Sequence, residues 1–549
     1  RSSDLGGSII GAHYYLALRE LLESRSDSEI TQEDYLRLVK NIEEKFVEGV
    51  QQNIRTRALA ELLTNLQRVL FSGYSRTRRV GELYEREIFS RIGKDEKERK
   101  RRKRQKLWMS ELRIHPMNEE GQQAADFDWR YNNWLRRNKV PALVINAATL
   151  NTGHSWHFTP FEMGEPPPMW ESNIETNYYL PVIKYEDAPE RFPRVRLGHA
   201  VAASSCVPGL FEPLVLDNLY EGKSVLLVDG GVCDNQGIQG LLQNNCDVIL
   251  VSDGSGQTGA LDVPGSGVVG VLGRSAGISQ ARVREAQYYD LKARKRSSIL
   301  REFLFLHLKE GLIAAEVNVV GWPQRSRDED ERRTGYGVAR DVQELLAGVR
   351  TDLDSFCDAE AYALMASAYR MTERALSDSE FFRGRAGTEK RVQWKFLDIE
   401  DNMRVGGKKK EKLKVLLKAS ASRTLRFWKM TKPTKYAGIL MAFALLAGAV
   451  VASRYLPWRS VFPAWSGSRL NTRELVWAVA ILLGLILLRF IIGELYQPAQ
   501  IWFKRQRQSI LYRLIGVILL CGGFLIARLH LWTFDKLFLA LGRLKRFKS

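Results

Sequence analysis

A carboxylate stands at the end of a short apolar run at Asp229, and two glycines follow it directly. Residues 225–228 are all apolar, which is typical of a buried strand, so Asp229 would lie at the strand's carboxyl end. A carboxylate there can act as a general base, because ligands of open α/β sheets bind beyond the carboxyl ends of the strands. Gly230 and Gly231 permit a tight turn and a close approach of the backbone to a ligand. The same residues also fit an Asp-Gly turn that only reverses the chain, and taken alone they favour that turn.

The other chemistry-bearing residues predict neither a metal site nor a nucleotide site. His154 and His157 have the H-x-x-H spacing, but no third ligand stands near them, so we expect a loop histidine pair without a metal. The G-S-G at 265–267 lacks Walker spacing and a following Lys-Ser or Lys-Thr pair. The five cysteines form no C-x-x-C pair, which favours free thiols in a reducing compartment. We therefore expect no metal and no cofactor.

Strands and helices that alternate along the chain must position Asp229. A glycine-rich stretch at 5–11 leads into apolar residues at helical spacing over 12–22, so a helix amino end there could hold an anion or an oxyanion. Strands are predicted at 141–146, 225–228, 246–253 and 303–308. This alternation predicts an α/β domain whose sheet is mostly parallel and flanked by helices.

The charge of the chain indicates an anionic partner. The 549 residues carry a net charge of +19, from 82 Lys and Arg against 63 Asp and Glu, which suits nucleic acid or an anionic membrane surface. Residues 94–106 form a mostly basic run that we interpret as a solvated surface. No aromatic or groove-reading elements stand beside it, so we expect no nucleic acid as partner.

The carboxyl-terminal part changes in composition and predicts a membrane region. Residues 408–435 contain eleven Lys or Arg and one acid, Glu411, and would contact anionic headgroups. Apolar blocks follow at 436–452, 475–488 and 514–527. Since a spanning helix needs about 20 apolar residues, these blocks predict two or three transmembrane helices. The basic excess before them predicts that the preceding domain lies in the cytoplasm.

Five short stretches occur in a fixed order along the chain. They read G-G-S-I-I-G-A-H-Y-Y at 6–15, I-N-A-A-T-L-N-T-G at 145–153, A-V-A-A-S-S-C-V-P-G-L-F at 200–211, V-D-G-G-V-C-D-N-Q-G at 228–237 and R-T-D-L-D-S-F at 350–356. Together they resemble the patatin-like phospholipase family, and in particular bacterial members with membrane helices after the hydrolase domain. The resemblance covers residues 5 to about 375.

This resemblance implies hydrolysis of lipid ester bonds by a Ser-Asp dyad on an α/β fold. Asp229 of the D-G-G motif, formed with Gly230 and Gly231, would take the serine's proton without a histidine. A glycine-rich loop upstream of the serine would supply backbone N–H groups to the oxyanion.

The chain departs from the family pattern at the nucleophile. The family serine lies in a G-x-S-x-G turn, and alignment of residues 6–11 puts Leu5 at its position. Leu5, Gly6 and Gly7 are therefore the remnant of this turn. We interpret Ser8 as a helix-start residue rather than a displaced nucleophile. The family's first strand and oxyanion loop would precede Arg1.

The expected organisation has three parts. Residues 1–400 would form a patatin-like phospholipase domain without its first strand and oxyanion loop, residues 401–435 a basic juxtamembrane segment, and residues 436–549 a membrane region. The expected function is that of a membrane-anchored lipid acyl hydrolase, integral to the bacterial inner membrane, with membrane lipids as substrate. The alternative is a catalytically inactive patatin-like membrane protein that binds lipid or protein.

Overall fold

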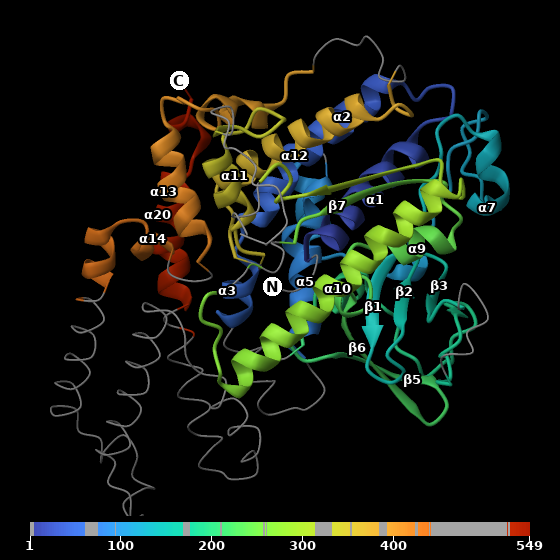
Figure 1. Ribbon diagram of the computed structural model, residues 1–549. Helices are drawn as coiled ribbons and strands as arrows, with labels where there is room; N and C mark the ends of the chain where they lie inside the picture. Colours follow the sequence, from blue (N-terminus) through green and yellow to red (C-terminus); the bar gives the residue numbers. More distant parts are fainter. Residues whose placement is uncertain are drawn as a thin grey trace, which may run out of the picture.

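The computed structural model describes most of the chain up to residue 440 and the carboxyl-terminal end (Figure 1). The described residues are 5–60, 75–93, 95–167, 176–208, 211–255, 259, 261–312, 332–351, 354–383, 392–422, 426–438, 440, 524 and 527–548.

An antiparallel sheet carries the predicted strand that ends at Asp229. Its six strands lie in the order β4-β3-β2-β1-β6-β5, and every neighbouring pair is antiparallel. The strands are β1 (Ile145–Thr149), β2 (Ser155–Phe158), β3 (Glu162–Gly164), β4 (Ile183–Lys184), β5 (Leu214–Tyr220) and β6 (Lys223–Asp229).

The predicted mostly parallel sheet is wrong. The only parallel pair among the described strands is β7 (Val248–Asp253) with β8 (Glu302–His307), and the long helix α10 (Val268–Arg296) lies between them in the chain. Residues 150–154 connect β1 to β2, and a turn at Glu221 and Gly222 connects β5 to β6. Such short connections join only antiparallel neighbours, whereas parallel strands need a crossover of a dozen residues or more. The alternation of strand and helix therefore predicts the sheet correctly only where α10 makes that crossover.

Three helices cover the sheet around the first apolar core. They are α1 (Leu5–Ser24), α5 (Arg76–Glu87) and α8 (Leu197–Ser204). A Cβ atom on Gly81 of α5 would overlap the backbone of Gly198 in α8, and the reverse also holds. The two helices therefore cross with their backbones in contact, which only glycine at both positions permits. The small buried residues of α8 also let this helix pack closely against β1 and β6.

The remaining elements around this part of the molecule are short or peripheral. They are α2 (Gln32–Val50), α3 (Ile54–Leu59), α6 (Glu96–Arg102), α7 (Trp129–Asn132), α9 (Ile238–Gln243) and the 3-10 turns η1 (Phe89–Ile92), η2 (Met109–Glu111), η3 (Asn133–Leu135) and η4 (Gly230–Val232).

A second apolar core joins helices from the end of the predicted hydrolase domain to the carboxyl terminus. Figure 1 shows α13 and α20 side by side. The elements of this part are α11 (Arg340–Ala347), α12 (Asp358–Asp378), η6 (Lys395–Asn402), α13 (Lys410–Ser420), α14 (Arg426–Lys429), α20 (Phe534–Leu541) and η8 (Leu544–Arg546).

A network of buried charges lies beside this second core. Arg350 Nη1 donates to Glu360 Oε1 at 2.6 Å, and Arg426 contacts the same carboxylate at 3.3 Å. Arg426 Nη2 also lies 3.2 Å from Asp354 Oδ1 and 3.7 Å from Asp535 Oδ1. All five side chains are almost fully buried. A charge in such a place is tolerated only while its partners remain, so the network holds α12, α14 and α20 together.

The basic segment predicted to face lipid is partly engaged within the protein. Lys410 and Lys414 of α13 pair with Asp341 of α11 at 2.8 and 3.0 Å, and Arg426 is buried in the charge network. Contact of residues 408–435 with anionic headgroups stays a prediction.

The predicted membrane anchoring requires a correction. No helix in the described part of the chain combines the length and the apolar character needed to cross a membrane. The prediction of two or three transmembrane helices in an integral protein of the bacterial inner membrane is therefore wrong for these residues. Most of the three apolar blocks, at 436–452, 475–488 and 514–527, lies outside the described residues.

Replacement of Glu360 by Gln should lower the free energy of unfolding by about 3 kcal/mol near neutral pH, because two buried guanidinium groups then share one carboxylate fewer. Burial alone would raise the pKa of Glu360, but Arg350 and Arg426 lower it below its usual value. A carboxylate with a lowered folded pKa stabilises fully above its unfolded pKa of about 4.3, and this stability is lost as the pH falls through the folded value.

Urea unfolding between about pH 7 and about pH 3 tests this expectation. The unmodified chain should lose more stability on acidification than Glu360→Gln, and the difference between the two isolates the titration of Glu360. Glu411→Gln is the matched control, since Glu411 is 81% exposed on α13, and it should stay within about 0.5 kcal/mol of the unmodified chain. Identical pH slopes for Glu360→Gln and the unmodified chain would contradict the assignment.

Candidate active site

Asp229 is the last residue of β6 and is fully buried. Its Oδ1 accepts a hydrogen bond from the backbone N–H of Gly231 at 2.8 Å. Its own backbone N–H donates to the carbonyl of Cys206 at 3.0 Å, and its strand position pairs with Ala147 of β1. The carboxylate is thus held in one orientation by the turn that follows it and by the strand beside it.

The first glycine of the D-G-G motif lies against the backbone of β1. A Cβ atom on Gly230 would lie 2.6 Å from the carbonyl oxygen of Asn146, closer than real Cβ atoms come to any neighbour. Gly230 is therefore required by a close approach of two backbones, in addition to the turn that the sequence predicts. This contact sets where the chain leaves β6, and with it the position of Asp229.

A cavity of about 460 Å³ opens over this turn, and we call it the central cavity. Its wall is formed by the amino end of α1, the segment before β1, the D-G-G turn and the loop that leads to α9. Gly7 and Ser8 from α1 line it together with Gly230 and Gly231. Residues more than 200 positions apart in the chain, predicted from their motifs alone, therefore meet in one cavity.

The amino end of α1 contains Leu5, the residue that the predicted alignment puts at a nucleophile position. Leu5 is the first residue of α1, and Gly6 and Gly7 follow it in the exposed first turn. Ser8 is half-buried, and its Oγ lies 2.6 Å from Oγ of Ser204 in α8. The prediction of Ser8 as a residue of the helix start agrees with this position. Because backbone N–H groups at a helix start lack partners within the helix, this end of the cavity favours a negative charge.

Neutral groups surround the buried carboxylate. The pKa of the Cys206 thiol is raised to about 12, mainly by burial and in smaller part by the charge of Asp229, while a hydrogen bond with Thr77 lowers it. Burial also raises the pKa of the Tyr84 phenol above its usual value, against a hydrogen bond to Ser205 at 3.3 Å. Both groups thus keep their protons near neutral pH. The groups beside the Asp229 carboxylate therefore add no charge of their own.

The two histidines of the H-x-x-H pair lie apart and make different contacts. His154 Nδ1 lies 2.9 Å from Oε2 of Glu165, a buried carboxylate that also accepts from the Thr149 hydroxyl at 2.9 Å. His157 lies elsewhere, under Gly240, and burial lowers its pKa to about 4. The residues next to Glu165 in the sequence do not indicate these contacts, because its partners come from the β1–β2 hairpin.

Two other carboxylates of the domain are occupied with the fold. Asp234 accepts from the backbone N–H groups of Ile238 and Gln239 at 3.1 and 2.8 Å, and so caps the start of α9. Asp253 ends β7, where it accepts from the N–H of Ser255 at 2.9 Å. Both side chains thus hold the backbone that follows them in place.

Two further cavities border the central one and were not predicted. One of about 450 Å³ has a mixed lining, with apolar residues such as Phe161 and Met163 and polar ones such as Arg130 and Glu162, and it shares residues 142–144 with the central cavity. The other, of about 340 Å³, is the basic cavity, and it shares Asn235 with the central cavity. The basic cavity was not predicted because the glycine-rich residues 254–277 indicate a loop. In the structure, α10 already begins at Val268 within this stretch.

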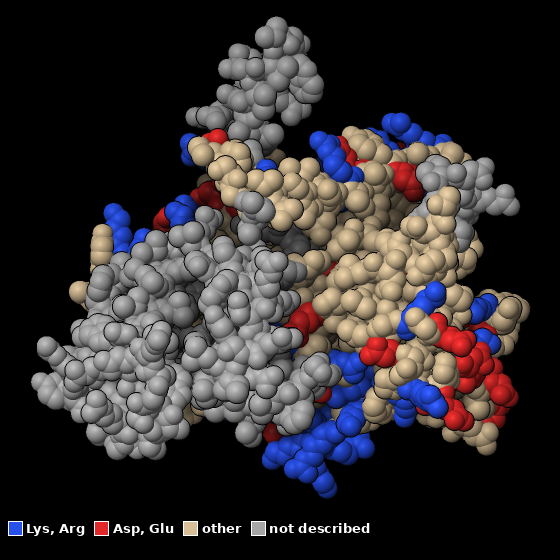
Figure 2. Space-filling view, turned by 90° about the horizontal axis from the view of Figure 1, so that it is seen from below, with Lys and Arg blue, Asp and Glu red and all other residues tan. Residues whose placement is uncertain are grey.

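The start of α10 exposes apolar side chains. Leu261, Val263, Val271 and Leu272 are all exposed there. Figure 2, seen from below the view of Figure 1, shows a broad area of uncharged described side chains with basic and acidic groups around it. This surface would suit an approaching molecule that is itself partly apolar.

Comparison of the chain with protein-family models, with curated proteins and with solved structures found no match.

Replacement of Gly230 by Ala should destabilise the fold by about 1–3 kcal/mol, because the added methyl group meets the Asn146 carbonyl and forces the backbone to move. Gly240→Ala is the control within the same cavity wall, since a Cβ atom there meets only ordinary contacts at 3.4 Å or more. Alanine also favours a helix over glycine by about 1 kcal/mol, so this control should be neutral or stabilising in α9. Urea denaturation measures both, and equal stabilities for the two variants would contradict the close approach.

Proposed function

We propose that this chain has the architecture of a patatin-like lipid acyl hydrolase domain, in which Asp229 would be the general base for a serine at position 5. One observation carries the proposal. Asp229 is buried and held by a glycine turn, and Gly230 and Gly231 of this turn line a cavity that the start of α1 also lines. Hydrolysis of an ester by a Ser-Asp dyad needs these parts: a base that cannot rotate away, space for the ester, and a helix amino end near the developing negative charge.

The chemistry proposed for this site is acyl transfer to a hydroxyl and then to water. The base takes the hydroxyl proton while the oxygen bonds to the ester carbon, and the alcohol leaves with a proton as the tetrahedral intermediate collapses. Water then attacks the acyl group in the same way and releases the fatty acid. The contact of Oδ1 with the Gly231 N–H supports this role for Asp229, because it fixes the orientation of the carboxylate.

A second candidate function is lipid binding without hydrolysis. Leu5 stands at the first position of α1, where the family resemblance requires the nucleophile, and an alkyl side chain cannot attack an ester. The nearest described hydroxyl on α1 belongs to Ser8, one turn along the helix and hydrogen-bonded to Ser204. A rise of about 4.5 Å over three helical residues is far more than catalysis tolerates, since about 1 Å of displacement can cost roughly a hundredfold in rate.

Labelling by a fluorophosphonate, which reacts with activated serines, separates these functions. We expect the unmodified chain to take no label and Leu5→Ser to label slowly at residue 5, as located by mass spectrometry. Ser8→Ala in the Leu5→Ser background should label as Leu5→Ser does. Label on Ser8 of the unmodified chain would contradict the assignment of Leu5 to the nucleophile position. Complete failure of Leu5→Ser to label would favour lipid binding without hydrolysis.

The role of Asp229 has its own test in the Leu5→Ser background. Asp229→Asn is nearly isosteric but cannot accept the proton, so labelling and hydrolysis of a short-chain ester should fall about a hundredfold or more. Asp234→Asn is the matched control, because an asparagine can also cap a helix and Asp234 lines the central cavity beside the D-G-G turn. Its labelling rate should stay within about threefold of the parent variant. Equal losses in the two variants would refute a specific role for Asp229 as base.

A further inference from the structure

The cavity of about 450 Å³ contains buried polar atoms that lack hydrogen bonds, and we call it the mixed cavity. Its lining includes His157 of β2 and Gln243 of α9. His157 is 8% exposed, and its Nε2 atom has no hydrogen-bond partner in the described part of the chain. Both polar atoms of the Gln243 amide are likewise buried without a partner among the described residues. Since buried polar atoms are nearly always hydrogen-bonded, these three atoms suit a polar molecule that enters the cavity.

His157 and Gln243 face the same space from two different elements. Gly240 lies three residues before Gln243, so the two share one face of α9. A Cβ atom on Gly240 would lie 3.6 Å from Cε1 of His157, so this face lies against the His157 ring. Burial lowers the pKa of His157 to about 4, and the ring is therefore neutral near neutral pH. A neutral imidazole and an amide can each both donate and accept hydrogen bonds.

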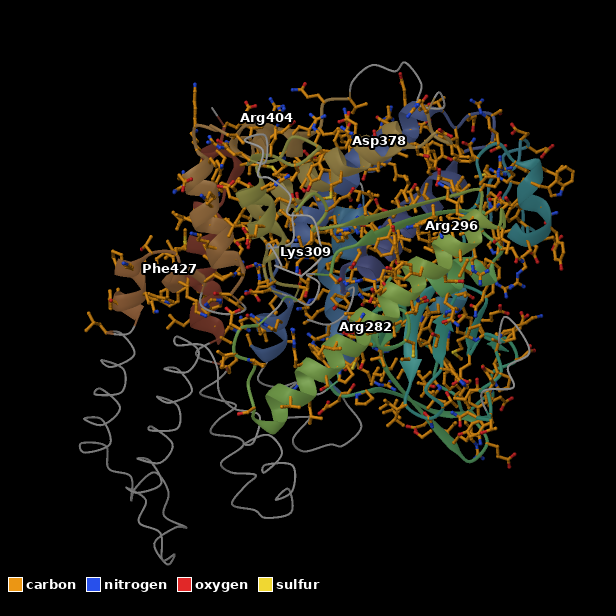
Figure 3. The ribbon with its side chains drawn as sticks, in the orientation of Figure 1. Arg282, Arg296, Lys309, Asp378, Arg404 and Phe427 are labelled. Carbon is orange, nitrogen blue, oxygen red and sulfur yellow. The ribbon has the colours of Figure 1, made fainter. Side chains whose placement is uncertain are left out.

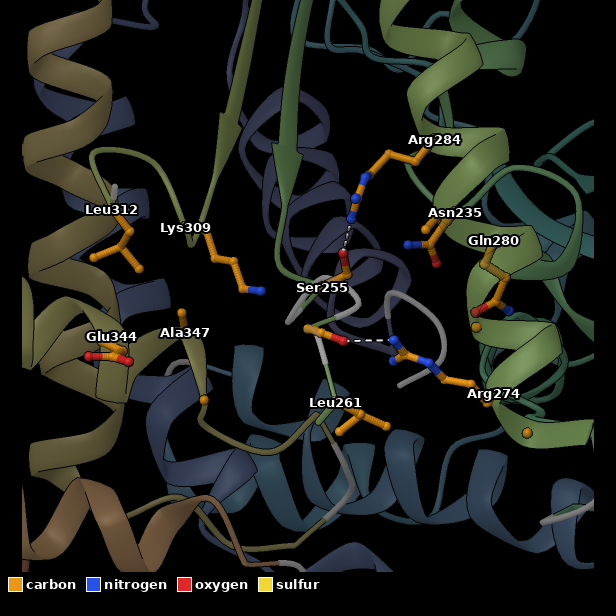
Figure 4. Close-up of a pocket in the computed structure, with 15 residues that line it drawn as sticks. Asn235, Ser255, Leu261, Arg274, Gln280, Arg284, Lys309, Leu312, Glu344 and Ala347 are labelled. Atoms are coloured by element: carbon orange, nitrogen blue, oxygen red, sulfur yellow. Dashed lines mark hydrogen bonds between the residues drawn. The ribbon is translucent and has the colours of Figure 1, made fainter. Parts of the chain in front are cut away.

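The lining of the mixed cavity carries no excess of charge. Its two charged residues, Arg130 and Glu162, form an ion pair at 3.0 Å. Positive charge gathers instead along α10, which carries Arg282 and Arg296 among other cations (Figure 3). Arg284 of the same helix is directed into the basic cavity (Figure 4). The mixed cavity therefore suits a neutral ligand rather than an anionic one.

Aromatic side chains continue from the mixed cavity onto the surface. Trp129 of α7 and Phe161 line the cavity, and their ring planes are tilted by 44°, so they form no parallel slot for a flat base. The same segment of the chain then exposes Tyr131 by 73% and Trp134 by 75%. Two large exposed aromatic side chains beside a cavity are typical of a binding surface. We call these two residues the aromatic surface.

Hydrogen bonds fix the backbone that presents the aromatic surface. Lys139 Nζ donates to the carbonyls of Asn133 and Trp134 at 3.0 and 3.1 Å. The Asn133 side chain accepts from the N–H of Val140 at 2.8 Å and donates to its carbonyl at 3.0 Å. Because this backbone is already in place, a ligand that packs on Trp134 would bind without first ordering the segment, which lowers the entropic cost of binding.

We propose that the mixed cavity and the aromatic surface bind a carbohydrate chain. A sugar ring is neutral, and its hydroxyl groups both donate and accept, as the Gln243 amide and the His157 ring require. Its polarised C–H bonds also pack on the negative face of an aromatic ring such as that of Trp134. One ring would occupy the cavity, and the following rings would lie on the aromatic surface. This inference is independent of the proposed function.

Titration calorimetry with the full chain tests this site, with saturation-transfer NMR for weak ligands. The probes are maltotetraose, cellotetraose and tetra-N-acetylchitotetraose, the monosaccharide of each, and adenosine as a neutral ligand of another class. We expect at least one tetrasaccharide to bind with a Kd of about 1 mM or lower, and its monosaccharide to bind about tenfold more weakly, since a single ring reaches only the cavity. Absence of binding by all three tetrasaccharides, or equally tight binding of adenosine, would overturn the proposal.

Variants of the cavity lining separate a sugar site from a merely structural role. Gln243→Leu should weaken the binding of tetrasaccharide and monosaccharide alike by about tenfold, as expected for the loss of two hydrogen bonds. His157→Phe keeps the shape of a ring without its nitrogens and should give a similar loss. Gln236→Leu is the matched control, because the Gln236 amide is also buried without a partner among the described residues but lines the central cavity. Thermal unfolding confirms that each variant keeps the fold, and equal weakening by Gln236→Leu and Gln243→Leu would contradict the site.

Variants of the aromatic surface separate a sugar from a lipid surface as the partner. Trp134→Ala should weaken tetrasaccharide binding by about fivefold and leave monosaccharide binding unchanged. Leu135→Ala is the matched control, since Leu135 is 67% exposed beside Trp134 but has no flat face, and it should leave both affinities unchanged. Binding of the chain to phosphatidylglycerol vesicles that both variants weaken equally, without any binding of sugar, would overturn the carbohydrate site and identify a lipid surface as the partner.

Discussion

The antiparallel pairing of β6 with β1 is the constraint on which the candidate site depends. Its register puts Asp229 opposite Ala147, so the backbone of the next residue, Gly230, lies against the carbonyl of Asn146. A shift of one residue in this register would turn every side chain of β6 to the other face of the sheet. The Asp229 carboxylate would then lie among different neighbours. The buried position of Asp229, the turn beneath the central cavity and the path of the chain to α9 all follow from this one register.

A second constraint, the burial of charge, organises the other half of the molecule. Arg350, Asp354, Glu360, Arg426 and Asp535 come from segments far apart in the chain and are almost fully removed from water. Each would be strongly destabilising if left alone, because the cost of removing an ion from water is compensated only by close partners of opposite charge. The carboxyl-terminal helix α20 therefore belongs to the same folded unit as α12, and the R-T-D-L-D-S-F stretch contributes to stability rather than to the candidate chemistry.

The three adjoining cavities differ in the side chains that line them. One cavity has a mixed lining of apolar and polar side chains, the glycine turn above Asp229 lines the next, and two arginines with a lysine line the third. The exposed apolar residues at the start of α10 lie close to the basic cavity.

The sequence by itself determined the local features of this protein. The apolar run before Asp229 predicts β6, the strand at 246–253 is β7, the helical spacing over 12–22 lies within α1, and the D-G-G motif is a tight turn. Only the tertiary structure decided that the main sheet is antiparallel, that Gly230 is required by Asn146, and that Glu165 pairs with His154. The same holds for the basic cavity, whose cations come from a helix that the sequence predicts in part as a loop. The physical reason is that backbone propensity and apolar periodicity act over a few neighbouring residues. Strand pairing, close backbone contact and the grouping of charges arise instead between residues that the chain separates by tens or hundreds of positions.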